Sequence, residues 1–189
     1  NVFIGKTDVS GMTKEEAVKA VDNTLGDYRN KQLVLKVKDQ GADVSIEEMG
    51  AEVENIDKLA EKAVGYGKNG SIWSRYQKIH NLDKKKYVID ESFKVEEAKL
   101  RELIQERAVP LEQKAVNASA SYNGSGFDLT DEAEGYTVDV DKSVKKIKNF
   151  MNKKWNYEDA EVELKLDTEE PTIKKTDLES LQDELGSYT

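Results

Sequence analysis

Apolar residues recur along the chain at spacings that predict alternating strands and helices. Two stripes have the 3.6-residue period of an amphipathic helix. They are formed by Ile56, Leu59, Ala60, Ala63 and Val64 in the first case and by Val140, Val144, Ile147, Phe150 and Met151 in the second. Short apolar or alternating segments predict strands at residues 1–5, 32–38, 42–46, 117–122 and 127–130. Mixed elements with mostly antiparallel pairing favour the α+β class.

Helix starts are marked by short polar side chains. In "DVSGMTKEEAVKAV", residues 8–21, Thr13 is the expected N-cap and Glu16 completes a capping box. Gly11 permits the preceding turn. Further N-caps are expected at Asn55, Ser71 and Asp139, and after Pro171 at Thr176, with Glu179 completing its capping box and Gly186 ending its helix. This chemistry predicts helices and specifies no function.

The chain also shows a weak internal repeat. Gly50, Val53 and Asp57-Lys58 match Gly135, Val138 and Asp141-Lys142. Each half has the order strand, helix, hairpin, helix, with hairpin turns expected at Gln40-Gly41 and Asn123-Gly124. We therefore expect two similar α+β halves, residues 1–64 and 86–171, packed together. Residues 65–85 would connect them through a short helix packed between them, and residues 172–189 would be a linker and the start of a following domain.

Composition excludes several functions. The 189 residues carry a net charge of −9, which argues against nucleic-acid binding and predicts repulsion from anionic wall polymers. There is no cysteine, so disulfides and thiolate chemistry are excluded within the chain. No apolar run approaches the ~18 residues of a membrane span. We expect no cofactor and no metal, and the sequence does not predict the oligomeric state.

Three motifs suggest chemistry but are better explained by structure. Ser143-Val144-Lys145-Lys146 fits the S-x-x-K pattern of penicillin-binding enzymes, but no K-T-G follows, so we expect Ser143 on a solvated helix face. His80 is the only histidine and is expected to end a short helix. The acidic residues 128–135 lack the glycine and terminal glutamate of a calcium loop and are expected to form a strand and a turn. The chain is therefore expected to be no enzyme.

Aromatic residues are the best candidates for ligand binding. Tyr66, Trp73 and Tyr76 cluster around glycines, with Arg75 between them. Flat ring faces suit sugar rings, while Arg and Tyr hydroxyls suit carboxylates. The alternative is that Trp73 and Tyr76 only dock a short helix onto the core. The pair Trp155 and Tyr157 has the same two interpretations. The run Lys84-Lys85-Lys86 is expected to be solvated loop.

The order of several short motifs resembles a known family. They are "DVSGMTKEEA", "GAEVENIDKLAEKAVGYGKNGSIWSR", "EGYTVDVDK" and "EEPTIKKTDLESLQDELGSYT". Together they resemble the N-terminal region of VanW-family proteins, where a peptidoglycan-binding domain is described. The same domain precedes the catalytic domain of some L,D-transpeptidases. The resemblance is most specific over residues 57–171, and "LGSYT", residues 185–189, resembles the start of a VanW domain.

The resemblance implies a function. It predicts a non-catalytic, extracytoplasmic module of the bacterial cell wall that binds peptidoglycan and presents a VanW-like domain. A membrane segment outside this chain would hold the module. Two alternatives stay open: a structural spacer without a ligand, and the same module taken from an L,D-transpeptidase.

Overall fold

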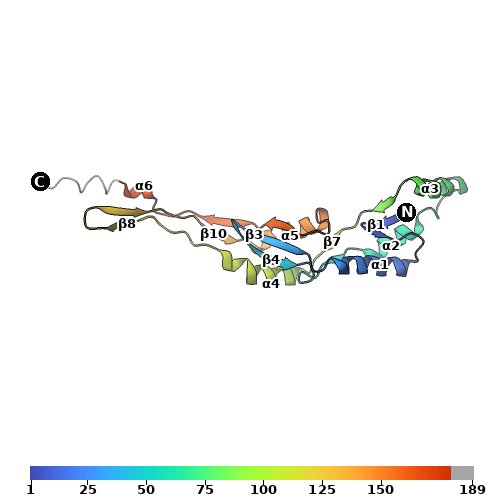
Figure 1. Cartoon of the computed structure of the whole chain (residues 1–189), viewed down its shortest axis with the longest axis horizontal. Helices are drawn as coiled ribbons and strands as arrows, with labels where there is room; N and C mark the ends of the chain where they lie inside the picture. Colours follow the sequence, from blue (N-terminus) through green and yellow to red (C-terminus); the bar gives the residue numbers. More distant parts are fainter. Residues whose placement is uncertain (180–189) are drawn as a thin grey trace.

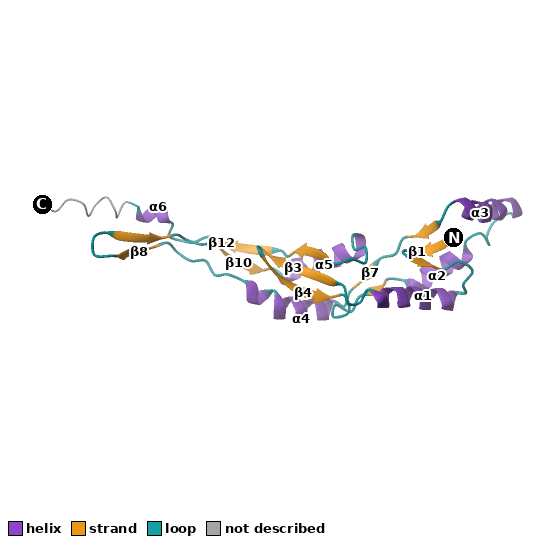
Figure 2. Ribbon diagram, viewed as in Figure 1, coloured by secondary structure: helices purple, strands orange, loops and turns teal. Residues whose placement is uncertain are grey.

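The computed structural model describes residues 1–179, which form an elongated body of two lobes and a projecting end (Figure 1). The N-terminal lobe contains β1 (Val2–Ile4), β2 (Thr7–Asp8), α1 (Lys14–Asp27), α2 (Ile56–Gly65), α3 (Ile72–Lys84) and β6 (Tyr87–Ile89). The middle lobe contains β3 (Gln32–Val37), β4 (Gln40–Ser45), β7 (Phe93–Lys94), α4 (Glu97–Arg107), η1 (Val109–Leu111), β10 (Gly135–Val138), α5 (Val140–Lys153), β11 (Ala160–Glu163) and β12 (Leu166–Glu169). The opposite end contains β8 (Ser119–Tyr122), β9 (Phe127–Thr130) and α6 (Lys175–Leu178). Helices and strands are mixed throughout, which confirms the α+β class (Figure 2).

The N-terminal lobe packs two helices against a small sheet. β1 pairs antiparallel with β2 and parallel with β6, so residues 1–8 are joined to residues more than 80 positions away. α1 begins at the expected capping box: Thr13 accepts from the Glu16 backbone, and the Glu16 carboxylate accepts from the Thr13 backbone. The buried side of α1 packs on α2, which fixes the position where α2 ends.

The middle lobe is built around the sheet β11–β3–β4. β3 and β4 form a hairpin, and β11 adds to β3 in parallel, with Ala160 opposite Leu33. Leu33, Leu35 and Val37 on the inner face of β3 are fully buried. α4 and α5 pack on one another and are joined by an ion pair between Lys148 and Glu97, 2.7 Å apart. In the predicted stripe of α5, Val144, Ile147 and Met151 are buried, and Val140 and Phe150 are half-buried.

The two lobes meet at β5 (Glu52–Val53), which contacts α1 and pairs antiparallel with β7. An aromatic cluster fills this junction and contains Tyr28, Phe93, Trp155 and Tyr157. Trp155 and Tyr157 are buried, so the interpretation of this pair as part of the core is confirmed.

The internal repeat is not confirmed by the structure. The order of elements is similar in the two halves, but the strands pair across them: β3 of the first half joins β11 of the second. The hairpin β8–β9 stands instead at the far end of the molecule (Figure 1). Gly50 and Gly135 also act differently. Gly50 has a φ of +61° in a turn, whereas Gly135 lies in a strand where a Cβ would be 2.3 Å from the Ala115 nitrogen.

Residues 65–85 are not packed between two halves. Most of them form a loop and α3, which lies at the extreme end of the N-terminal lobe (Figure 1). The prediction of a short helix capped by Ser71 is confirmed, since its Oγ accepts from the Ser74 backbone. Its packing was predicted wrongly because sequence order suggested a central connector, whereas β1 and β6 pair directly and leave α3 outside.

Three local predictions are corrected. The first hairpin turns at Lys38-Asp39, because Lys38 adopts a φ of +53°, and not at Gln40-Gly41. Asn55 precedes α2 in a left-handed conformation that makes no side-chain cap. α6 begins at Lys175, so Thr176 lies inside it and is not its N-cap. The expected helix stop at Gly186 and the expected VanW start at residues 185–189 lie outside the described residues.

Candidate functional site

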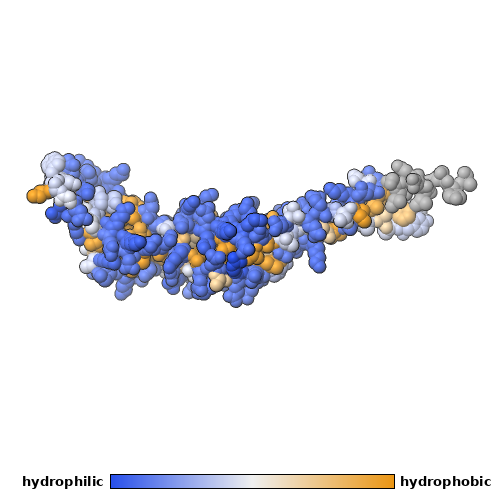
Figure 3. Space-filling model, turned by 180° about the vertical axis from the view of Figure 1, so that it is seen from behind, coloured by the Kyte–Doolittle hydropathy of each residue, from blue (hydrophilic) through white to orange (hydrophobic). Residues whose placement is uncertain are grey.

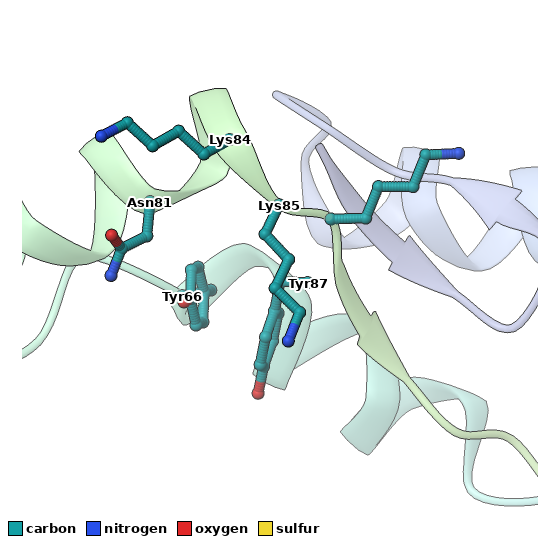
Figure 4. Close-up of a pocket in the computed structure, with 6 residues that line it drawn as sticks. Tyr66, Asn81, Lys84, Lys85 and Tyr87 are labelled. Carbon is teal, nitrogen blue, oxygen red and sulfur yellow. The ribbon is translucent and has the colours of Figure 1, made fainter.

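A cleft of about 440 Å³ opens where α2 ends and α3 returns to the sheet (Figure 4). We call it the tyrosine cleft, and it is lined by Tyr66, Asn81, Lys84, Lys85, Lys86 and Tyr87. Its volume lies in the range of small-molecule sites. Two glycines with positive φ, Gly67 and Gly70, turn the chain between the two helices and so bring Tyr66 and Asn81 together.

The wall of the cleft is a pair of stacked rings. Tyr66 and Tyr87 have centroids 3.8 Å apart and planes inclined by 19°. Tyr66 is held as the C-cap of α2, where its N–H donates to the Ala63 carbonyl, and Tyr87 is held by pairing of β6 with β1. Both are half-buried. The rings are therefore fixed before any ligand arrives, which lowers the entropy lost on binding.

The rim of the cleft is cationic. Lys84, Lys85 and Lys86 are exposed, and Figure 4 shows the Lys85 side chain running beside the Tyr87 ring while Lys84 points away along α3. The ammonium of Lys86 lies 4.5 Å from the centre of the Phe3 ring. Among the described side chains, Lys84 and Lys85 are in no ion pair with a carboxylate. Their charge is available to an anionic group of a ligand.

A second, smaller cavity of about 240 Å³ adjoins the same tyrosine. Its lining includes Tyr66 together with Ser10, Gly11 and Met12 from the stretch that leads into α1. The capped start of α1 therefore also shapes the surroundings of the tyrosine cleft.

The four residues predicted as a site separate in the structure. Tyr66 lines the tyrosine cleft, whereas Trp73, Arg75 and Tyr76 lie on α3 outside it. Trp73 is 67% exposed and Tyr76 is 59% exposed, so the alternative that they dock α3 onto the core is wrong. Their rings stack with centroids 6.0 Å apart.

The sequence pattern does not identify Asn81 or Tyr87, and it predicts a solvated loop for the three lysines. Lys84–Lys86 are indeed exposed, but they border the stacked rings. A sequence signal existed, because this basic run immediately precedes a tyrosine in a strand. The partner of that tyrosine follows from the parallel pairing of β1 and β6, which no local pattern encodes.

The structure gives the remaining chemical motifs structural explanations. Ser143 is fully buried, not solvated as expected, and its Oγ accepts from the Lys165 backbone at 2.9 Å. His80 lies within α3 and stacks on Tyr76, with four more helical residues after it. The expected strand before residue 131 is confirmed as part of β9, but the expected turn after it is not formed, because Ala133 forms an antiparallel bridge with Val116 and Gly135 begins β10. Lys175 pairs with Asp131 at 2.6 Å. No group of metal-binding side chains occurs among the described residues.

A family model described as "Putative peptidoglycan binding domain" matches residues 42–160 of the chain. This is more than half of its length. The chain belongs to this family. The matched residues include the whole tyrosine cleft and α3, and membership associates the protein with the bacterial cell wall.

Two further comparisons found no relatives. No curated protein matches the chain, and no solved structure matches it. Among the described helices, none combines the length and apolar character needed to cross a membrane.

Proposed function

We propose that the protein is a non-catalytic, extracytoplasmic module of the bacterial cell wall that holds peptidoglycan in the tyrosine cleft. One observation carries this proposal. The stacked rings of Tyr66 and Tyr87 stand beside three exposed lysines, within the part of the chain that matches the peptidoglycan-binding family.

The cleft suits both components of peptidoglycan. An aromatic wall offers apolar contact to a sugar ring, and the Asn81 amide and lysine amines offer hydrogen bonds to carboxylates of the stem peptide. The chain as a whole has a net charge of −9, yet residues 65–88 carry six basic side chains and one acidic residue. This local charge overrides the repulsion expected from the net charge, because charges farther than about 8 Å are screened at 0.15 M salt.

The affinity of one such site is expected to be low. A half-exposed ring pair with a few charged contacts supports a dissociation constant on the order of 0.1–1 mM, or about −4 to −5 kcal/mol. That is sufficient on a polymer that presents many copies of the ligand near an attached module.

The resemblance of the tail to the start of a VanW domain supports presentation of a VanW-like domain after this module. The tyrosine cleft and α6 lie at opposite ends of the body, which would separate the wall contact from whatever follows (Figure 1). An L,D-transpeptidase parent is the alternative. The non-catalytic assignment is supported by Ser143, whose hydroxyl is buried and hydrogen-bonded to Lys165.

Sedimentation with purified insoluble peptidoglycan tests the proposal. The chain should pellet with the wall, and Lys84→Glu/Lys85→Glu should weaken the apparent affinity about tenfold by reversing two rim charges. The matched control is Lys145→Glu/Lys153→Glu, which reverses two exposed charges on α5. Circular dichroism establishes that all variants are folded. Equal weakening by both pairs would mean that only net charge matters and would remove the cleft from the proposal.

A spacer without a ligand is the second candidate, and the elongated body favours it (Figure 1). Absence of pelleting by the native chain at high wall concentration would favour the spacer over the binding module.

A further inference from the structure

The outer face of α3 is the most exposed apolar surface among the described residues. It consists of Ile72, Trp73, Tyr76 and Ile79, whose side chains are 86%, 67%, 59% and 55% exposed. Their spacing puts them on one side of the helix. Figure 3 shows hydrophobic atoms projecting at this end of the molecule. Apolar side chains gathered in this way, and not scattered singly, mark a surface that is covered by something.

α3 stands apart from the body. None of its described side chains is buried, and its contact with the lobe runs through the opposite side, where Leu82 packs against the core and its carbonyl accepts from the Asn1 amide at 2.7 Å. Ile79 lies against the loop before α3, where a Cβ at Gly67 would be 3.1 Å from its Cγ1. Ile72, Trp73 and Tyr76, which are more exposed, are therefore not needed to attach α3.

This end of the chain is basic. Arg75 lies one helical turn from both Ile72 and Ile79 and borders the outer face. Lys78 lies one turn before Leu82, on the side of α3 that meets the lobe, and Lys68 lies in the loop before α3. Among the described side chains, these three form no ion pair with a carboxylate. A helix with a strongly apolar face, interfacial Trp and Tyr, and basic flanks has the properties of helices that lie in the surface of an anionic lipid bilayer.

We propose that the outer face of α3 docks on an anionic lipid membrane, with α3 parallel to the surface. Ile72 and Ile79 enter the apolar boundary, Trp73 and Tyr76 lie at the level of the headgroups, and Arg75 contacts a lipid phosphate. This inference is independent of the tyrosine cleft, which lies at the other end of α3.

Charge and shape favour lipid over the other occupants. A second copy of the chain would bring two basic faces together, and like charges repel across an interface. Glycan strands stack on flat rings, so they leave unexplained the exposed aliphatic side chains of Ile79 and of Ile72, which is the most exposed of the four. A lipid surface accepts both the aliphatic side chains and the positive charge.

The test is co-sedimentation of the 189-residue chain with vesicles of phosphatidylglycerol and phosphatidylcholine, compared with vesicles of phosphatidylcholine alone, at 0.15 M salt. The native chain should bind the anionic vesicles. Emission of Trp73 should shift to shorter wavelength on binding, whereas Trp155 is 7% exposed and contributes a constant background.

The variants separate the apolar from the charged contribution. Ile72→Ser/Ile79→Ser should lower partitioning at least about tenfold. Arg75→Gln should lower it about fivefold, whereas Lys78→Gln, on the lobe-facing side of α3, should lower it less. The matched control is Val116→Ser/Tyr122→Ser, which removes two apolar side chains that are 53% and 68% exposed at the other end of the body. That control should leave partitioning unchanged, and all of these positions are exposed enough for the variants to fold.

Three results would overturn the proposal. The first is equal partitioning with and without phosphatidylglycerol, or none. The second is loss of a concentration-dependent dimer in Ile72→Ser/Ile79→Ser, which would assign the face to self-association. The third is a native chain that does not bind vesicles, together with an Ile72→Ser/Ile79→Ser variant that no longer pellets with peptidoglycan. That result would assign the face to contact with the cell wall.

Discussion

The phenol of Tyr157 donates a hydrogen bond to the carboxylate of Glu91, a residue 66 positions earlier in the chain. Glu91 follows β6 of the N-terminal lobe, and Tyr157 belongs to the aromatic cluster at the junction. Lys6 adds a second link, because its ammonium lies 4.9 Å from the Tyr157 ring centre and donates to the Asn156 carbonyl. Tyr157 has a φ of +69°, a left-handed conformation that its packing and this hydrogen bond must hold. The pair therefore fixes how the two lobes are joined.

Tyr157→Phe should destabilise the protein by about 1–3 kcal/mol, because it removes the hydrogen-bond donor to the half-buried Glu91 carboxylate. The other oxygen of this carboxylate has no hydrogen bond among the described residues. Urea unfolding measures the free energy. Tyr76→Phe, at an exposed ring, is the control and should change it by less than about 0.5 kcal/mol. Equal effects would show that the Glu91 contact does not stabilise the junction.

The Glu91 carboxyl should give the junction a characteristic pH dependence. Burial raises the pKa of Glu91 above its ordinary value of 4.5 in the folded state. Between 4.5 and the raised value the folded state keeps a proton that the unfolded chain loses, so this contribution to stability falls as pH rises through that window.

Glu91→Gln removes this titration and keeps a hydrogen-bond acceptor for Tyr157. The difference in unfolding free energy between the variant and the native chain should therefore favour the variant more at pH 7 than at pH 4. Urea unfolding at both pH values measures it. Glu102→Gln, on an exposed surface of α4, should show the same difference from native at both pH values. A Glu91→Gln effect that is independent of pH would contradict the burial of a charged carboxylate here.

Glu48 should make stability depend on pH in the opposite sense to Glu91, at acid pH. Hydrogen bonds from Arg107 and from the Ser45 backbone lower the pKa of Glu48 to about 2. The folded state then releases a proton that the unfolded chain holds between pH 2 and 4.5, so stability falls as pH decreases through this window. Both side chains are more than a third exposed, which limits the effect to about 1 kcal/mol. Between pH 4.5 and 2 the unfolding free energy of Glu48→Gln should fall less steeply than that of the native chain. An unchanged slope would contradict a stabilising contact between Glu48 and Arg107.

Two glycine substitutions should have opposite signs. A Cβ at Gly135 would lie 2.3 Å from the Ala115 nitrogen, so Gly135→Ala should cost about 2–3 kcal/mol through displacement of backbone. Gly26 lies in α1 with open space around its position, so Gly26→Ala should stabilise by about 0.5–1 kcal/mol. Thermal unfolding of the two variants compares them directly. Similar effects would mean that β10 and Ala115 are not packed as closely as described.

The sequence predicted local elements well and their partners poorly. The capping box of Thr13 and Glu16, the Asp139 cap and the stripe of α5 were all found, because each depends on residues within one or two turns. The parallel pairing of Ala160 with Leu33 was not found, since β11 has only four residues and its pattern does not specify a neighbour. The internal repeat failed for the same reason: matching local patterns do not determine which strands pair.

The candidate site was found only in part. Tyr66 was identified from its place among glycines, but its stacking on Tyr87 requires β6 to lie beside β1. Trp73 and Tyr76 were grouped with it because they are close in sequence. Their separation from the tyrosine cleft arises from the direction in which α3 leaves the body, a property that periodicity does not determine.

The most direct test of the central claim is an NMR titration of the isotope-labelled chain with a soluble peptidoglycan fragment that contains both sugar and stem peptide. Binding in the tyrosine cleft predicts that saturable amide shifts concentrate at residues 66–68 and 81–88, with few changes in α5 or in the β8–β9 hairpin. Shifts confined to Trp73 and Tyr76, or no shifts at millimolar fragment, would contradict the account.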